Sequence, residues 1–217
     1  MKKTVWIFDL DGTLVDSVSQ IGYSINRARN DFGYEELPSE KIMELVGLPI
    51  QNFLSDLPLD NYVIDSLITC FREILEHEIE RENLVFPGVE LLLSKLHKDG
   101  YKLAIATNKP TYLAELVVKN SCLNEFIDLI QGTDGFPAKP DPTCLLMVME
   151  SLGTGEAIMV GDRVEDILAA RAAGIDSIGI ANSFHNTQEL KFAGAVHVFD
   201  SFLDFANSKE MRNLLID

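Results

Sequence analysis

The chain has 217 residues, and 47% of them are hydrophobic, which is enough for a core and argues against intrinsic disorder. A formal net charge of −16 disfavours nucleic acid and anionic membrane surfaces as partners, because both are negatively charged. The three cysteines (Cys70, Cys122 and Cys144) form no C-x-x-C pair, which argues against a disulfide framework or a zinc site and favours a cytoplasmic protein.

Short apolar runs recur along the chain and alternate with segments of helical spacing. The first run ends at Asp9, and no run approaches the roughly 20 residues that a membrane span requires. Helical patterns precede Gly100 and Gly174, and glycine is common directly after the end of a helix. This alternation predicts an α/β fold with a Rossmann-like, doubly wound parallel sheet. The predicted strands cover residues 4–8, 103–106, 126–130, 157–160 and 177–180.

One stretch, residues 17–86, interrupts the alternation. It contains no convincing strand, and Pro38, Pro49 and Pro58 divide its first part into short helices before a long helical pattern at 61–83. We therefore expect an all-helical cap domain at 17–86, which we call the helical insert, and an α/β core domain made of 1–16 and 87–217. The insert has five basic and thirteen acidic residues, which is half of the net charge.

Polar residues follow the predicted strands at the points where they end. Ligands of an open parallel sheet bind beyond the carboxyl ends of its strands, so these residues are expected to meet at one edge. Glycine in the first loop lets the backbone approach a ligand closely. The residues in question are Asp9, Asp11, Gly12, Thr107, Asn108, Lys109, Lys139, Asp162 and Asp166.

The chemistry of this set points to phosphoryl transfer. Asp9 and Asp11 flank Leu10 at the end of an apolar strand, an arrangement that is costly without a ligand. Clustered carboxylates repel one another, and an oxygen-preferring dication such as Mg²⁺ relieves the repulsion. A lysine and free backbone N–H groups beside the metal suit a phosphate. Each residue alone is common in turns and caps, but the set in this order is not.

The first of these loops also carries a family resemblance. The run Phe8-Asp9-Leu10-Asp11-Gly12-Thr13-Leu14-Val15-Asp16-Ser17 resembles the first motif of the haloacid dehalogenase superfamily. The segments that resemble its second, third and fourth motifs are Thr107-Asn108, Lys139-Pro140 and Gly161-Asp162 with Asp166. The helical insert is similar to the C1 cap. Within the superfamily the chain most resembles the phosphoglycolate phosphatase branch, on the runs Thr107-Asn108-Lys109, Ala138-Lys139-Pro140-Asp141-Pro142 and Val46-Gly47-Leu48-Pro49.

The resemblance implies a Mg²⁺-dependent phosphatase for a small phosphorylated metabolite. It implies that Asp9 is the nucleophile that forms an aspartyl-phosphate, and that Asp11 is the general acid and then the general base. The metal ligands that it implies are Asp9, the backbone carbonyl of Asp11, and Asp162. Asp166 is expected beside them, as a ligand or as a residue that orients one.

The remaining site residues are expected to bind the phosphate or to contact the rest of the substrate. Gly12, Thr107, Asn108 and Lys139 are expected to bind the transferring phosphoryl group. Gly47, Leu48 and Pro49 are expected to contact the substrate, because Gly and Pro fix a tight backbone in this loop of the insert. Lys109 is expected either to contact the substrate as well or to face solvent. The cap is expected to close, to exclude water and to read the leaving group. The oligomeric state, monomer or homodimer, stays open.

The activities of some other branches of the superfamily fit these residues less well, and those of others remain alternatives. A dehalogenase lacks the second acid of the first motif, so Asp11 favours a phosphatase. A phosphonatase has a Schiff-base lysine in the cap, and the insert has only Lys41. A mutase has a histidine in the first cap helix, and residues 17–32 contain none. Nucleotidase, pyrophosphatase and sugar-phosphate phosphatase share all four motifs.

Two functions outside the superfamily's enzymes fit the residues less well. A phosphoacceptor signalling domain has a similar sheet with acids at strand ends, but it lacks a helical insert and has its phosphorylated Asp on a middle strand. A non-catalytic binding protein is disfavoured because every motif residue is present. Arg163 stands where the branch often has a small residue, and it is expected to bridge Asp162 or Asp166 or to face solvent.

Overall fold

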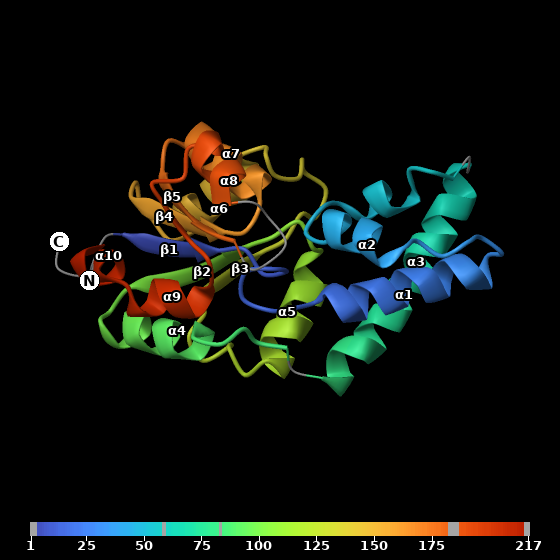
Figure 1. Cartoon of the computed structure of the whole chain (residues 1–217), viewed down its shortest axis with the longest axis horizontal. Coiled ribbons are helices and arrows are strands. Elements are labelled where there is room, and N and C mark those ends of the chain that lie inside the picture. Colours follow the sequence, from blue (N-terminus) through green and yellow to red (C-terminus); the bar gives the residue numbers. More distant parts are fainter. Residues whose placement is uncertain (1–3, 58–59, 83, 182–186, 215–217) are drawn as a thin grey trace.

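A six-stranded parallel sheet forms the centre of the computed structural model, which describes residues 4–57, 60–82, 84–181 and 187–214 (Figure 1). The strand order is β3-β2-β1-β4-β5-β6, so the chain winds from β1 to one edge and then back to the other. This confirms the predicted doubly wound α/β fold. The strands are β1 (Val5–Phe8), β2 (Lys102–Ala106), β3 (Leu129–Gln131), β4 (Ala157–Gly161), β5 (Asp176–Ile180) and β6 (His197–Phe199).

Two strands differ from the sequence prediction. The predicted strand at 126–130 pairs only from Leu129 onward, because Asp128 instead joins β2 through its backbone N–H and its carboxylate, which bond to Leu103. The edge strand β6 was missed, because three half-buried residues give no apolar run. Both strands lie on the outer parts of the sheet, where burial is incomplete.

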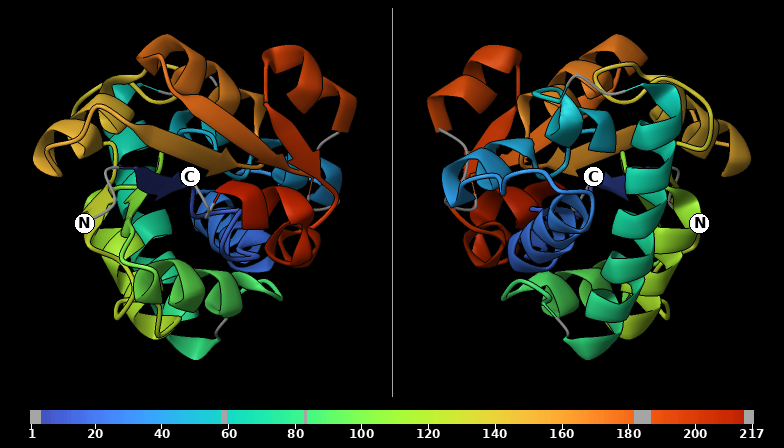
Figure 2. Two further views of the ribbon diagram at one scale, coloured as in Figure 1. Left: turned by 90° about the vertical axis from the view of Figure 1, so that its left-hand side faces the viewer. Right: turned by 90° about the vertical axis from the view of Figure 1, so that its right-hand side faces the viewer.

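Helices cover both faces of the sheet (Figure 2). The reason is the alternation within the central strand: Trp6 and Phe8 face the larger apolar core, and Val5 and Ile7 face a second core on the other side. Because β1 lies between β2 and β4 and helices cover both faces of the sheet, all four of its residues are buried. The helices of these layers are α4 (Val89–Lys98), α5 (Thr111–Asn120), α6 (Thr143–Ser151), α7 (Val164–Ala173), α8 (Thr187–Ala193), α9 (Phe202–Asn207) and α10 (Lys209–Leu214).

The helical insert forms a group at one end of the sheet in Figure 1. Its helix α1 packs against α3 through apolar side chains that include Ile25 and Leu67. The long pattern predicted to reach residue 83 ends at Arg81, and the predicted break at Pro58 lies outside the described residues. The elements of the insert are α1 (Val18–Asp31), α2 (Ser39–Leu45), the 3₁₀ helix η1 (Ile50–Leu54) and α3 (Asn61–Arg81).

The two connections between the insert and the sheet run side by side. Val15 and Val85 form an antiparallel bridge, and the Asp16 N–H donates to the Leu84 carbonyl at 2.8 Å. The chain thus leaves and returns at one place, next to the loop that follows β1. Among the described residues, no helix combines the length and the apolar character needed to cross a membrane.

Candidate active site

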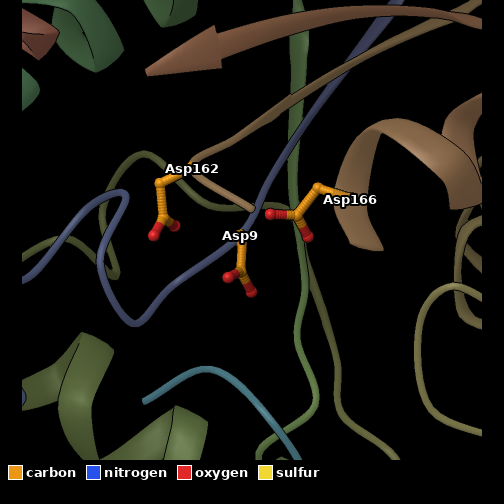
Figure 3. Close-up of side chains that lie close together, drawn as sticks. All are labelled: Asp9, Asp162 and Asp166. Atoms are coloured by element: carbon orange, nitrogen blue, oxygen red, sulfur yellow. The ribbon is translucent and has the colours of Figure 1, made fainter. Parts of the chain in front are cut away.

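Three buried carboxylates converge at the carboxyl edge of the sheet (Figure 3). Asp9 follows β1, Asp162 follows β4, and Asp166 lies in the first turn of α7. One oxygen of each lies within 4.8 Å of the others. The Asp9 N–H donates to the Val160 carbonyl at 2.9 Å and so continues the ladder between β1 and β4. We call these three residues the acid cluster.

Lys139 is the cation of the acid cluster. Its Nζ lies 2.8 Å from Asp9 Oδ1 and 2.6 Å from Asp166 Oδ1, and it donates to the Ala106 carbonyl at 2.8 Å. Burial by itself lowers the pKa of Lys139, but the charges of Asp166 and Asp9 raise it above its usual value. Lys139 therefore stays protonated, and one ammonium faces three carboxylates.

This imbalance shifts the protonation of the acids. Burial raises the pKa of Asp9 to about 6; Lys139 opposes this shift, and the charges of Asp166 and Asp11 add to it. Burial, with repulsion from Asp166 and Asp9, raises the pKa of Asp162 well above its usual value, although Thr13 Oγ1 donates to it at 2.7 Å. The cluster carries more negative charge than its surroundings neutralise.

The surroundings of the acid cluster fit a hard divalent cation. Asp9 Oδ1 and Asp11 Oδ1 are buried and have no hydrogen-bond partner among the described residues, although Asp9 Oδ1 lies beside the Lys139 ammonium. A Cβ on Gly12 would lie 2.5 Å from Asp162 Oδ2, so only glycine leaves room there. Carboxylate and carbonyl oxygens are the ligands that Mg²⁺ prefers. The residues could therefore hold a metal ion.

The predicted phosphate-binding residues lie around the acid cluster, and several of them also form hydrogen bonds within the protein. The Gly12 N–H donates to the Val15 carbonyl at 2.9 Å within its own loop. The Asn108 side chain donates from Nδ2 to the Gly47 carbonyl and accepts from the Lys139 N–H, both at 2.9 Å. Asn108 thereby connects the third motif to the helical insert. Thr107 Oγ1 accepts from the Lys109 N–H at 3.3 Å.

The predicted substrate-contacting residues line one cavity between the insert and the core. The cavity has a volume of about 130 Å³, and we call it the insert–core cavity. Lys109 is buried there, and its Nζ pairs with Asp11 Oδ2 at 2.9 Å. The structure thus brings together Asp11, Gly47, Leu48, Pro49 and Lys109.

Two arginines of this region were not identified as contacts from the sequence. Arg163 is buried, and its Nη1 donates to the carbonyls of Glu44 at 3.1 Å and Val46 at 2.9 Å. The expectation of a solvent-facing side chain is wrong, because this side chain crosses to the insert. Arg72 of α3 lines the insert–core cavity. The sequence did offer a signal for Arg163, because an arginine is unusual at the position after Asp162. It offered none for Arg72, which is one of many charged residues on its helix.

Comparison with known proteins agrees with this geometry. The sequence profile of the haloacid dehalogenase-like hydrolases matches residues 6–180. The chain is 33% identical over 208 residues to the probable phosphatase IndB of Dickeya dadantii, covering 92% of this chain and 90% of that protein. It is 34% identical over 207 residues to a phosphoglycolate phosphatase of Caulobacter vibrioides, covering 91% of this chain and 86% of that protein.

A solved structure shows the same fold over nearly the whole chain. The crystal structure of a predicted phosphatase from Clostridium acetobutylicum superimposes with a TM-score of 0.86 and 30% identity, covering 98% of this chain and 100% of that one. These matches confirm the predicted fold class and the family resemblance. They also confirm the prediction of an enzyme of the phosphatase type.

Proposed function

Since the chain belongs to the haloacid dehalogenase-like hydrolases, we propose that it hydrolyses a small phosphate monoester with Mg²⁺, through an aspartyl-phosphate on Asp9. The observation that supports this most is the buried acid cluster around Lys139, next to a cavity that contains Asp11. Burying three carboxylates costs folding free energy, and a bound dication offsets that cost. A purely structural role gives no reason for this arrangement.

The proposed metal ligands are the carboxylates of Asp9 and Asp162 and the backbone carbonyl of Asp11, with Asp166 as a ligand or as a neighbour that orients one. When bound, Mg²⁺ neutralises carboxylate repulsion and polarises the phosphoryl oxygens. Lys139, Thr107 and the Asn108 N–H are proposed to bind the transferring phosphoryl group. Their positive charge and N–H groups stabilise the charge that develops on its oxygens.

In the first step, a carboxylate oxygen of Asp9 attacks the phosphorus. The bond between phosphorus and the leaving oxygen breaks, and the carboxylic acid of Asp11 donates its proton to that oxygen, which departs as an alcohol. In the second step, the Asp11 carboxylate takes a proton from water, and the resulting hydroxide attacks the phosphorus. The Asp9 carboxylate and inorganic phosphate are released, and Asp11 is again protonated.

The helical insert is proposed to act as the cap that closes over this chemistry. Asn108 and Arg163 donate to three carbonyls of one short segment of the insert, those of Glu44, Val46 and Gly47. Two loops of the proposed phosphate and metal sites thereby hold the insert against the core. Held in this way, the insert excludes water from the aspartyl-phosphate until the leaving group departs.

Among the alternatives within the family, the size of the cavity favours a small leaving group. A volume of about 130 Å³ is well below the roughly 300–1,000 Å³ of sites for drug-sized ligands, which favours a small alcohol over a nucleoside. The relatives named phosphoglycolate phosphatase give the first ester to test. The cysteines Cys70, Cys122 and Cys144 are free, which supports a reducing compartment such as the cytoplasm.

The test is a hydrolysis assay with p-nitrophenyl phosphate, with and without Mg²⁺, on the wild type and Asp9→Asn. We expect Mg²⁺-dependent turnover in the wild type and none in the variant. A screen of 2-phosphoglycolate, sugar phosphates, nucleotides and pyrophosphate then ranks substrates. Full activity of Asp9→Asn, or stable phosphorylation without turnover as in a phosphoacceptor domain, would contradict the proposal.

A further inference from the structure

Arg72 differs from the other basic residues of the helical insert. Four of the five pair with a carboxylate: Arg27 with Asp31, Arg29 with Asp56, Lys41 with Glu44 and Arg81 with Glu78. Arg72 forms no ion pair with any residue that the structure describes. In a chain with 34 acidic residues and 18 basic ones, an arginine without a carboxylate partner is unexpected.

The position of Arg72 explains why it lacks such a partner. It is half-buried on α3 and lines the insert–core cavity, which also contains Asp11 and Lys109. Lys109 is already paired with Asp11 at 2.9 Å. Glu76, one helical turn after Arg72, interacts with the phenol of Tyr112, whose pKa is raised by burial and by Glu76. The charge of Arg72 acts on the same phenol and lowers its pKa. The cavity therefore contains one guanidinium that forms no ion pair with a described carboxylate.

The rest of the cavity wall is mainly apolar. Leu48, Phe71, Leu75 and Leu113 contribute to it. A guanidinium at an apolar wall loses part of its hydration and is stabilised by an anionic ligand with matching hydrogen-bond geometry. The volume of about 130 Å³ leaves room for a small organic group.

We infer that Arg72 is a specificity-determining residue that binds an anionic group, best a carboxylate, at the far end of the substrate's alcohol half. The inference rests on the proposed function, because it assumes that the phosphate binds at the acid cluster. The substrate class is then a phosphate monoester with a short carbon chain and a second negative charge. The guanidinium fork binds a carboxylate through two hydrogen bonds, which a hydroxyl cannot match.

The experiment compares two esters of nearly equal size, 2-phosphoglycolate and 2-hydroxyethyl phosphate, which differ in having a carboxylate or a hydroxymethyl group. We expect the wild type to prefer 2-phosphoglycolate in kcat/KM. Arg72→Met is expected to lower kcat/KM for 2-phosphoglycolate about 10- to 100-fold, the range for a lost hydrogen bond to a charged group, and to change the neutral ester little. Arg72→Lys restores part of the preference. Arg81→Met removes a cation from the same helix and is the matched control.

The outcomes separate this inference from the proposed function. Equal use of the two esters by the wild type, or an equal loss on both in Arg72→Met, overturns the role of Arg72 while leaving a working phosphatase. The same loss of preference in Arg81→Met overturns it as well, because a general charge effect then explains the result. Absence of Mg²⁺-dependent turnover of both esters and of p-nitrophenyl phosphate refutes the proposed function itself.

Discussion

Charged side chains at the sheet edge are paired with one another, whereas one in the cavity beside the helical insert has no ion pair with a described residue. At the sheet edge Asp9, Asp166 and Lys139 are fully buried and in direct contact, so each side chain is fixed by its neighbours. In the insert–core cavity Arg72 is half-buried and has no ion pair with a described residue. In the proposed function the first region carries out the reaction on the phosphate, and the second offers a charge to a particular leaving group. Replacing residues in the two regions should therefore have different consequences.

The largest effect is expected for Asp9→Asn. Loss of the proposed nucleophile should lower kcat by about 10⁴-fold or more, because an amide oxygen does not displace the leaving group. The metal-free variant should nevertheless melt a few degrees higher at pH 7.5, because the raised pKa of Asp9 means that its charge destabilises the fold there. Steady-state kinetics and thermal melts in EDTA measure both. A lower melting temperature would show that the pair with Lys139 outweighs burial.

Replacing Lys139 by Met should come next. The change leaves the acid cluster without its ammonium, and breaking a buried pair costs about 3–5 kcal/mol of unfolding free energy. Urea unfolding with and without Mg²⁺ measures this loss, which the metal should partly reverse. Lys102→Met is the matched control, because Lys102 and Asp128 form a more exposed pair whose loss should cost about 1 kcal/mol or less.

A smaller effect is expected where the core holds the insert. Arg163→Met removes two hydrogen bonds to the insert, so KM should rise about 10-fold while kcat changes less, because closure rather than chemistry is weakened. Hydrogen exchange of the amides at 44–48 should accelerate in the variant. Arg171→Met, on the same helix, serves as the control, because Arg171 bonds to Ala193 and not to the insert. Unchanged KM and exchange would mean that other contacts hold the insert.

The smallest effect is a pH dependence that distinguishes the metal-free and metal-bound proteins. Burial raises the pKa of Asp9 from its usual 3.8 to about 6, so the stability that its proton contributes is fully present below the lower value and is lost as pH rises through about 6. The metal-free protein should therefore gain stability from this group as pH falls below about 6, whereas Mg²⁺ affinity should weaken by up to about tenfold per unit. Thermal melts and calorimetric titrations between pH 5 and 7.5 test both signs.

The sequence by itself determined the fold class and the residues at the sheet edge. Buried strands appear as apolar runs of four or five residues, and a polar residue at the carboxyl edge of the sheet follows each of these runs. Asp9 and Asp162 could therefore be placed from local pattern alone. The same reasoning failed for β6, whose three half-buried residues lack that contrast. The residues at the carboxyl edge of the sheet can thus be found from the sequence, because each of them directly follows its strand along the chain.

Only the tertiary structure decided what crosses between the core and the insert. Arg163 bonds to a carbonyl 117 positions earlier, Asn108 to one 61 positions earlier, and Arg72 lies in the cavity wall with Lys109. Such pairings depend on how two packed units meet, and a charged residue on a helix looks the same in the sequence whether it faces solvent or a cavity. The acids and the lysine of the sheet edge could therefore be placed from short motifs, whereas the bonds from Arg163 and Asn108 to the insert and the position of Arg72 could not.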